Sequence, residues 1–275
     1  MWKKRLVPLI LAAAMLGACG GCGDKTSDSK SANADDSKFI VGFDAAFPPY
    51  GYQDDNGEYV GFDLDLAAEV CSRNNWELVK TPIDWDAKDM ELNSGTISCI
   101  WNGFTMNGNE EGRLHMVREP YVWTTSQVFR WSRKRRRHCV VRWPRRKRLR
   151  CEYRLIPAAQ AALDEDENAD LKNSFKELLV VGDYNTAFMN LEAGAVDAIA
   201  MDIGVASYQL ESRSGGFTIL DEPLAAEQYA IGFKKGNTEL RDKVQKTLDE
   251  MAADGTFEKD RRKMGSAGRR HTLGK

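Results

Sequence analysis

Histidine is scarce in this sequence, with three residues among 275. The three, His115, His138 and His271, are far apart, and no nucleophile elbow, phosphate-binding glycine loop or set of Cys and His with zinc spacing occurs. General acid–base and metal chemistry need such groups in pairs or clusters. The sequence therefore predicts no catalytic residue, no metal ligand and no cofactor, and an enzyme is the least favoured class of function.

Long apolar runs are also lacking, apart from one at residues 6–18 that follows Lys3, Lys4 and Arg5. This run is shorter than the roughly 20 apolar residues that a membrane-spanning helix needs. A basic start, a short apolar run and small residues are typical of a secretory signal. The following Leu-Gly-Ala-Cys sequence, which ends at Cys19, resembles the lipobox of bacterial lipoproteins, in which the cysteine is acylated after cleavage. The alternative is an ordinary signal peptide that is cut nearby.

We therefore predict a signal peptide over residues 1–18 and a lipid anchor at Cys19, which would hold an exported protein on the outer side of the membrane, in the periplasm or at the cell surface. Residues 19–37 are rich in Gly, Ser, Asp and Lys and predict a flexible tether. Two cysteines of the remaining chain, Cys71 and Cys99, fall on an apolar helix face and in a buried strand. We interpret them as core residues, with a disulfide between them as the alternative.

From Phe39 onward, apolar patterns of strand and helix alternate, which indicates parallel sheets covered by helices. The same alternation resumes near Leu178, so two α/β units are expected. The predicted strands are 39–43, 77–81, 97–101, 178–181, 198–201 and 229–233, and the predicted helices are 62–73, 86–93, 185–192, 204–212 and 239–253.

Several motifs occur in a characteristic order: Val41-Gly42-Phe43-Asp44-Ala45-Ala46-Phe47-Pro48-Pro49-Tyr50, Gly61-Phe62-Asp63-Leu64-Asp65, Trp85-Asp86, Glu119-Pro120-Tyr121 and Leu191-Glu192-Ala193-Gly194, with Asp202 after the last. In this order they resemble family 3 extracellular solute-binding proteins, which serve ABC transporters for polar amino acids. The resemblance covers most of residues 38–260.

The resemblance implies an α/β fold of the periplasmic-binding-protein-like type II, in which two α/β lobes are joined by a two-strand hinge. Lobe 1 would comprise residues 38–124 and 224–264, lobe 2 residues 125–223, and residues 265–275 a tail. The implied function is that of the extracytoplasmic subunit of an ABC importer, which captures a polar amino acid by hinge closure. It would deliver the amino acid to the permease as a monomer, anchored to the membrane, with no role for nucleic acid.

A ligand-binding sensory domain of the same fold is the closest alternative. Such a domain is normally followed by a membrane span and a signalling module, and the sequence as given has neither, which favours transport. A periplasmic enzyme on this fold is a weaker alternative.

An amino-acid zwitterion needs a partner for its ammonium, donors for its carboxylate and a wall for its side chain. The resemblance assigns the ammonium to Asp202, for which the alternative is an N-cap of the next helix; both can hold. Phe47 and Trp85 would form aromatic walls, with core packing as the alternative for each. The other implied ligand-binding residues are Asp44, near the ligand's side chain, and Asn102, Gly103 and Thr105. Three further aspartates, Asp63, Asp65 and Asp197, are interpreted as structural.

One residue departs from the pattern. The family usually has an arginine a few residues after the position of Thr105, which grips the ligand's carboxylate through two hydrogen bonds. Here Arg113 lies a few positions further on. Either Arg113 reaches back to the ligand, or the site differs, or the sequence is locally shifted in reading frame.

Residues 130–150 contain twelve Lys and Arg and no acid, and removing these twelve charges would change the net charge of the chain from −2 to −14. A nucleic-acid patch does not suit an exported protein, and a surface for anionic lipid would interrupt an α/β lobe. A shifted reading frame is our preferred interpretation for 112–119, 130–156 and 260–275, because neighbouring frames can restore family-like sequence there. We expect the sequence as written to lose a strand of lobe 2 and to bind weakly, since like charges repel.

Overall fold

The computed structural model describes residues 37–106, 115–116, 121–131, 149–154, 163–164, 166–181, 183–213, 216–220 and 223–265, all of which belong to one compact unit, Ala34–Lys275. Residues 115–116, 122–131 and 149–154 are described by their backbone only. The predicted signal peptide, Cys19 and most of the tether and tail lie outside the described residues. Within the described ranges, no helix has the length and apolar character needed to cross a membrane.

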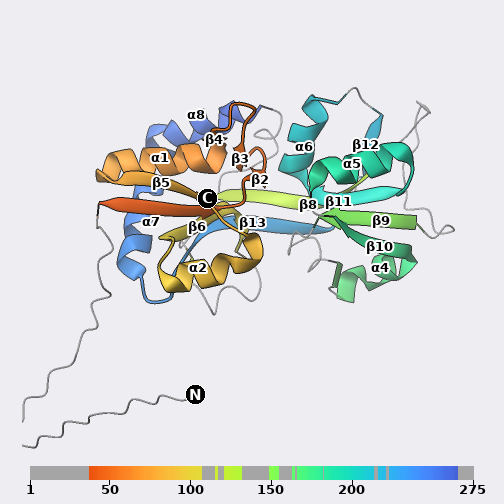
Figure 1. Ribbon diagram of the computed structural model, residues 1–275, viewed down its shortest axis with the longest axis horizontal. Coiled ribbons are helices and arrows are strands. Elements are labelled where there is room, and N and C mark those ends of the chain that lie inside the picture. Colours follow the sequence, from red (N-terminus) through yellow and green to blue (C-terminus); the bar gives the residue numbers. More distant parts are fainter. Residues whose placement is uncertain are drawn as a thin grey trace, which may run out of the picture. The chain divides into compact units, whose positions relative to one another are not determined.

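One sheet contains most of the strands, in the order β10-β9-β11-β8-β13-β6-β1-β5, with β12 beside β8 and β7 beside β13 (Figure 1). A second sheet consists of β2, β3 and β4. The strands are β1 (Lys38–Phe43), β2 (Ala46–Phe47), β3 (Gly51–Gln53), β4 (Tyr59–Val60), β5 (Glu77–Pro82), β6 (Cys99–Thr105), β7 (His115–Met116), β8 (Val122–Trp131), β9 (Leu149–Arg154), β10 (Phe175–Val181), β11 (Ala198–Asp202), β12 (Phe217–Ile219) and β13 (Ala225–Phe233).

The helices begin and end at residues suited to these places. Asp183 and Asp202 accept the backbone N–H groups of Thr186 and Val205 at the starts of α5 and α6, and Asn75 ends α1 in the left-handed conformation. The helices are α1 (Phe62–Asn74), η1 (Trp85–Ala87), α2 (Lys88–Ser94), η2 (Asp166–Asn168), α4 (Ala169–Ser174), α5 (Tyr184–Ala193), α6 (Ile203–Glu211), α7 (Thr238–Asp254) and α8 (Thr256–Lys263).

Two α/β lobes share the large sheet (Figure 1). We call lobe 1 the part built on β1, β5 and β6, which pair in parallel and carry α1, α2, α7 and α8. Lobe 2 is built on β9, β10 and β11, which also pair in parallel and carry α4, α5 and α6. Between them, β8 and β13 pair antiparallel and take the chain from one lobe to the other and back. The prediction of two α/β units with two crossing strands is confirmed.

The predicted elements lie where the apolar periodicity places them, with shifts of a few residues. One shift concerns the helix predicted at residues 86–93. Asp84 accepts the backbone N–H of Asp86, so the segment starts with the short 3₁₀ turn η1 and only then becomes α2. Strand β13 starts four residues before the prediction, at Ala225, because its first part pairs with β8.

The main hydrophobic cluster extends through both lobes and contains Trp101 and Phe43 of lobe 1 and Phe188 of lobe 2. A smaller cluster lies on the other face of β11, where Ala198 and Ala200 alternate with the residues of the main cluster. Cys71 and Cys99 are both buried and free, so the interpretation as core residues is confirmed.

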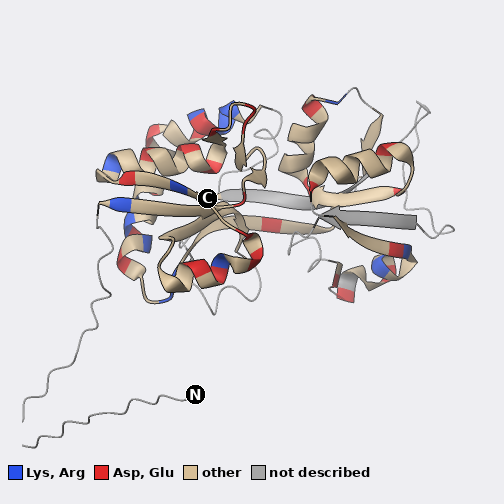
Figure 2. Cartoon of the chain, viewed as in Figure 1, with Lys and Arg blue, Asp and Glu red and all other residues tan. Residues whose placement is uncertain are grey.

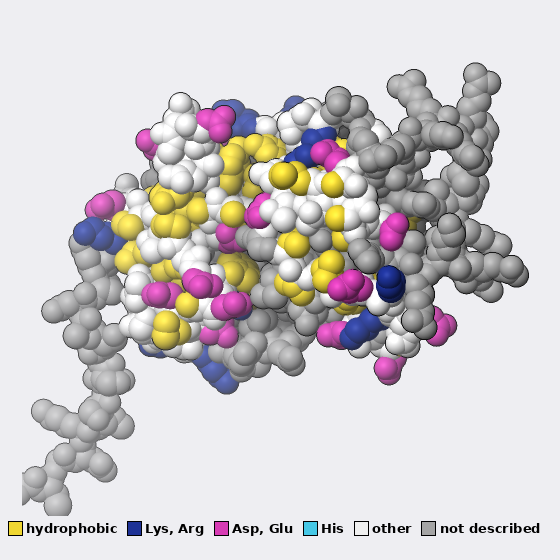
Figure 3. All heavy atoms as spheres, turned by 45° about the vertical axis from the view of Figure 1, so that its right-hand side comes forward, with side chains coloured by type: hydrophobic (Ala, Val, Ile, Leu, Met, Phe, Trp, Pro, Cys, Tyr) yellow, Lys and Arg dark blue, Asp and Glu magenta, His cyan; other side chains and the backbone are white. Residues whose placement is uncertain are grey.

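The surface carries charges of both signs on the helices (Figure 2). Figure 3 shows apolar side chains exposed in groups between charged and polar atoms. Among the described residues, the large hydrophobic side chains that are well exposed are Met90, Val180 and Met189.

The expectation that the written sequence loses a strand of lobe 2 is wrong for the backbone. Strands β8 and β9 cover both ends of the basic run, and each pairs with β11. A β ladder is formed by backbone N–H and C=O groups, so it tolerates unusual side chains. Residues 132–148, which hold most of the twelve basic residues, lie outside the described residues. In the suspected segment 260–275, the residues as written continue helix α8 to its end at Lys263. Met264, which follows the helix, is buried.

Candidate functional site

The predicted binding residues lie where strands end. Asp44 directly follows β1, Thr105 ends β6 and Asp202 ends β11. In open α/β sheets, ligands bind outside the carboxyl ends of the strands. These residues from both lobes therefore occupy the position that the fold offers for a ligand.

Asp202 is the centre of this group. Its Oδ1 accepts the backbone N–H of Val205 at 2.9 Å, so the predicted N-cap role is confirmed. The same oxygen accepts the hydroxyl of Tyr50 from lobe 1 at 3.1 Å. Asp202 is 1% exposed, and the Tyr50 hydroxyl of lobe 1 lies against its carboxylate, so the side chain is buried rather than open to solvent.

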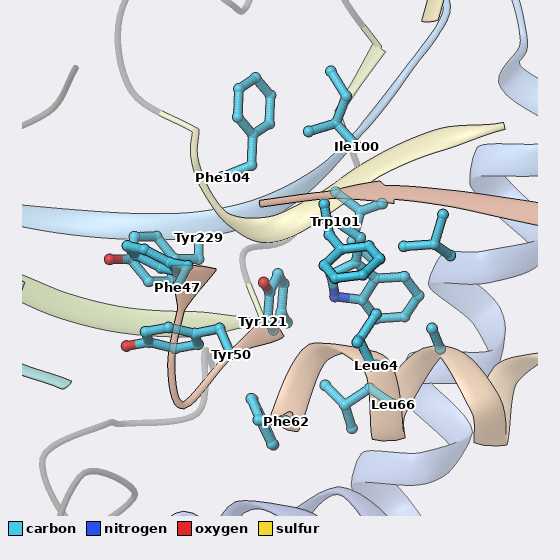
Figure 4. Packing of buried hydrophobic residues seen from close by; sticks show 14 of the residues in the cluster. Phe47, Tyr50, Phe62, Leu64, Leu66, Ile100, Trp101, Phe104, Tyr121 and Tyr229 are labelled. Atoms are coloured by element: carbon cyan, nitrogen blue, oxygen red, sulfur yellow. The ribbon is translucent and has the colours of Figure 1, made fainter. Parts of the chain in front are cut away.

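A group of aromatic rings packs around the Tyr50 ring. Phe47 stacks on Tyr50 with 5.1 Å between ring centroids, and Tyr229 meets Tyr50 edge-on at 5.3 Å. Tyr184 of lobe 2 lies 6.1 Å from Phe47. Figure 4 shows the rings of Phe47, Tyr50 and Tyr229 close together, with both hydroxyls pointing to the same side. Phe47 is 7% exposed and belongs to the main hydrophobic cluster, so the core-packing alternative holds for it, and its role as a wall for a ligand stays a prediction.

Burial controls the protonation of these tyrosines. It raises the pKa of Tyr50 and of Tyr229 well above the usual value, and the negative charge of Asp202 raises both further. Both hydroxyls therefore keep their protons at physiological pH. Tyr50 remains a hydrogen-bond donor to the carboxylate.

The last residues of β6 are held from several sides. Asn102 Oδ1 accepts the backbone N–H of Asp44 at 3.0 Å, while the buried Nδ2 has no hydrogen-bond partner among the described residues. The backbone N–H of Gly103 is donated to Asp63 Oδ2 at 2.7 Å. That amide is used inside lobe 1, so a ligand contact by Gly103 would have to come from its carbonyl.

Gly103 also has to be glycine. Its φ is +56°, and a Cβ there would come within 2.5 Å of the Phe47 ring. The missing side chain lets β6 approach the Phe47 ring closely.

Asp63 is structural, as interpreted from the sequence. Its Oδ2 accepts the Tyr121 hydroxyl at 2.8 Å as well as the Gly103 amide. Burial raises the pKa of Asp63 to about 7, although these two hydrogen bonds lower it. Asp63 thus joins the start of α1, the end of β6 and the residue that precedes crossing strand β8.

Thr105 contacts a carboxylate that the sequence did not single out. Its Oγ1 donates to Glu227 Oε2 at 3.2 Å. Glu227 is 3% exposed and is the one charged residue of crossing strand β13. Two buried carboxylates, Asp202 and Glu227, therefore influence this region, and both raise the pKa of Tyr229, after the larger effect of burial.

The remaining predicted residues are less closely connected to Asp202. Asp44 is half-buried, and its Oδ1 accepts the backbone N–H of Ala46 at 2.8 Å. Trp85 packs edge-on against Phe104 at 5.8 Å, and Lys88 Nζ lies 5.6 Å from its ring centroid. Trp85 thus contacts the residue next to Thr105. Arg113 and Cys19 lie outside the described residues.

Sequence reasoning missed Tyr50, Tyr229 and Glu227. Tyr50 ends the first family motif and Glu227 is a carboxylate in an otherwise uncharged strand, so each carried a signal. What the sequence could not supply was the contact of each with a residue more than one hundred positions away. Within the described ranges, no group of three or more His, Cys, Asp or Glu residues could hold a metal ion.

This arrangement of two α/β lobes with binding residues at their strand ends agrees with a match to a family model. Residues 39–266 match the model of bacterial extracellular solute-binding proteins, family 3. The chain belongs to this family. The fold is therefore the periplasmic-binding-protein-like type II fold that the sequence motifs implied.

Relatives within family 3 are binding proteins. The probable amino-acid-binding protein YxeM of Bacillus subtilis is 24% identical over 94% of this chain and 94% of its own length. The histidine-binding periplasmic protein of Escherichia coli is 25% identical over 80% of this chain and 84% of its own length.

Solved structures of family 3 type extend the likeness. An ancestral arginine-binding protein bound to arginine is 28% identical, with a TM-score of 0.71 over 84% of this chain and 99% of that protein. A substrate-binding protein of an ABC uptake transporter from Streptococcus pneumoniae, with bound histidine, has a TM-score of 0.72 at 24% identity, over 84% of this chain and 93% of that protein. An ancestral amino-acid-binding protein described as a precursor of cyclohexadienyl dehydratase shares the fold, with a TM-score of 0.71 at 21% identity, over 83% of this chain and 95% of that protein.

Proposed function

We propose that this chain is the extracytoplasmic solute-binding subunit of an ABC importer and captures a polar amino acid between its lobes. Asp202 carries the proposal: it is a buried carboxylate at a strand end, fixed by the N-terminus of α6 and reached from lobe 1 by Tyr50. A buried carboxylate is the partner that a desolvated ammonium requires. One relative is named for binding histidine and another was solved with bound arginine, and both ligands are amino acids.

The other predicted residues take roles that suit a zwitterion. Phe47 provides a wall, Thr105 and the amide of Asn102 provide donors for the carboxylate, and Asp44 and Trp85 lie toward the side chain. Arg113 is proposed as a further partner of the carboxylate. A buried amide such as Asn102 Nδ2 costs free energy unless a partner binds it, and a bound carboxylate would be such a partner.

The cellular setting follows the family and the N-terminal sequence. We infer an exported monomer, anchored through lipidated Cys19, that presents its closed form to the permease. It binds without catalysis, because hinge closure on a ligand needs no acid, base or nucleophile. Labelling with radioactive palmitate tests the anchor: incorporation should disappear in Cys19→Ser and persist in Cys22→Ser.

Isothermal titration against the common amino acids tests the proposed function. We expect at least one polar amino acid to bind with a Kd of about 1 μM or lower. At a ligand concentration of about 100 times Kd, binding should stabilise the protein by about 2.7 kcal/mol, which a thermal-shift assay detects. The titration should include a variant in which 130–156 is replaced by in-frame sequence. No binding by either protein would overturn the proposal.

A further inference from the structure

Tyr50 of lobe 1 and Asp202 of lobe 2 form a hydrogen bond between residues that are 152 positions apart. Tyr50 is fully buried and Asp202 almost so. The proposed ligand site lies between these two lobes, and Asp202 is the proposed partner of the ligand's ammonium. A group of lobe 1 that binds Asp202 therefore affects both the orientation of this carboxylate and the contact between the lobes.

The backbone of Tyr50 is firmly held in lobe 1. Its N–H donates to the carbonyl of Phe47 at 3.0 Å, and its carbonyl accepts the N–H of Asp63 at 2.9 Å. Gly61 packs so closely that a Cβ there would lie 2.3 Å from the Tyr50 carbonyl oxygen, and its φ is +135°. Only glycine suits this position. The residues at the start of helix α1 therefore fix the backbone position of Tyr50.

The ring of Tyr50 is fixed as well. It lies between the stacked ring of Phe47 and the edge-on ring of Tyr229. With backbone and ring both held, little conformational entropy remains to be lost when the hydroxyl makes its hydrogen bond. Such a donor is preorganised for one acceptor, which is Asp202.

Asp202 is held from the opposite side by lobe 2. Its Oδ1 receives the Val205 amide at the N-terminus of α6, whose dipole also favours a negative charge. The carboxylate thus receives one donor from each lobe. Hydrogen bonds to an ionised group are stronger than those between neutral groups, so both keep it oriented.

We propose that Tyr50 is a positioning residue for ligand capture: its hydroxyl holds the Asp202 carboxylate toward the ligand's ammonium and joins lobe 1 to lobe 2 on closure. This inference rests on the proposed function. It also predicts what Tyr50 does not do. Because the α-ammonium is common to all amino acids, Tyr50 sets the strength of binding and leaves the ranking of ligands unchanged.

The test is Tyr50→Phe, which removes the hydroxyl and keeps the ring between Phe47 and Tyr229. We expect the Kd of every amino acid that binds to rise by a similar factor of about ten, which corresponds to about 1.4 kcal/mol. Small-angle X-ray scattering should show a larger radius of gyration without ligand, because a link between the lobes is lost. A purely structural role in lobe 1 would change neither quantity.

Tyr59→Phe is the matched control. Tyr59 also lies in lobe 1 and also meets another ring edge-on, that of Phe43 at 5.2 Å, which belongs to the same lobe. Removal of the Tyr59 hydroxyl should leave the Kd and the radius of gyration unchanged. Tyr52→Phe offers a second comparison, since Tyr52 contacts Tyr208 of lobe 2 at 5.6 Å between ring centroids, away from Asp202.

The outcomes separate the inference from the proposed function. If the unaltered protein binds no amino acid, the proposed function fails. If it binds and Tyr50→Phe binds within about twofold of it, or if the ranking of ligands changes, this inference alone is wrong. Should Tyr50→Phe fail to fold, 3-fluorotyrosine at position 50 decides: a more acidic phenol is a stronger donor, so binding should tighten, and unchanged binding would refute the inference.

Discussion

The two lobes share an α/β plan but differ in how their cores and sequences support it. In lobe 1, β1 pairs with β5 over six consecutive residues, and an ion pair between Arg73 and Asp254 at 2.8 Å joins α1 to α7. In lobe 2, the second face of β11 presents alanines to a small separate cluster. In sequence, the basic run, residues 130–150, connects β8 to β9, a strand of lobe 2.

This difference indicates which part of the proposed site is firmly held and which part opens more easily. Lobe 1 supplies Phe47, the end of β6 and Tyr50, and both Phe47 and Tyr50 belong to the main hydrophobic cluster. Lobe 2 supplies the charge of Asp202 from a strand whose neighbours β8 and β9 flank the basic run. Regions with few buried apolar contacts open at lower free energy. We expect lobe 2 to limit both stability and affinity.

The largest expected effect concerns Asp63, at the centre of lobe 1. Its pKa of about 7 exceeds the value of about 3.9 for an unfolded chain. Between these values the folded state holds the proton and the unfolded state has lost it. The free energy of unfolding should therefore fall as the pH rises from about 4 to about 7, by up to about 4 kcal/mol, and level off above that.

Urea unfolding of Asp63→Asn across this pH range checks the effect. The amide oxygen still accepts from Gly103 and Tyr121 but does not titrate, so the decline should be weaker in the variant. Asp65→Asn is the control, because Asp65 lies in the same helical turn but pairs at the surface with Lys263 at 2.9 Å. If the free energy of unfolding depended on pH equally in the Asp63 variant and the unaltered protein, Asp63 would not be the group that causes the decline.

The second effect belongs to lobe 2 and concerns Asp202→Asn. Asparagine keeps the helix cap, since it caps about as well as aspartate, but removes the charge. Leaving a buried ammonium without its anion costs about 3 kcal/mol, so the Kd should rise about 100-fold or more in a titration with the best ligand.

Asp183→Asn is the matched control for this change. Asp183 caps α5 in the same lobe through Thr186, with Oδ1 2.8 Å from the backbone nitrogen, and it is exposed. Its replacement should leave affinity unchanged. If both variants lost affinity equally, the effect would come from lobe stability, and Asp202 would have no special role.

Sequence reasoning succeeded where the signal is local. Apolar periodicity placed α1 and β11 within one residue of their ends, and ordered motifs identified the family before any contact was known. It failed where the answer depends on packing between distant segments. The burial of Asp202 follows from Tyr50 in the other lobe, and the contact of Glu227 with Thr105 follows from the register of β13 against β6. No periodicity encodes a register across more than one hundred residues.

A smaller effect is expected from the basic run of lobe 2. Replacing the five consecutive residues 133–137 with serine removes five positive charges. We expect a gain in the free energy of unfolding on the order of 1 kcal/mol, the energy of one like-charged pair at about 4 Å in water. Thermal unfolding at low and physiological salt measures it: the unaltered protein should gain more from salt, which screens repulsion.

The same five replacements also test the comparison of the lobes. If lobe 2 limits affinity, the Kd should fall along with the gain in stability. If the variant and the unaltered protein had the same free energy of unfolding at both salt concentrations, repulsion within the basic run would not destabilise the protein. The reading-frame interpretation would then lose its physical support.

The smallest expected effect lies on the crossing strand between the lobes. Glu227→Gln removes a buried negative charge beside Thr105 but keeps an oxygen that accepts its hydroxyl. A cationic amino acid should lose affinity relative to a neutral one by about threefold, or about 0.7 kcal/mol, because the variant lacks a negative charge beside the proposed ligand residue Thr105. Competition between arginine and glutamine measures the ratio. Gln228→Glu is the control, because it makes the reverse change on the other face of β13 and should leave the ratio unchanged. If it also changed the ratio threefold, the preference would depend on the net charge of the protein and not on the position of Glu227.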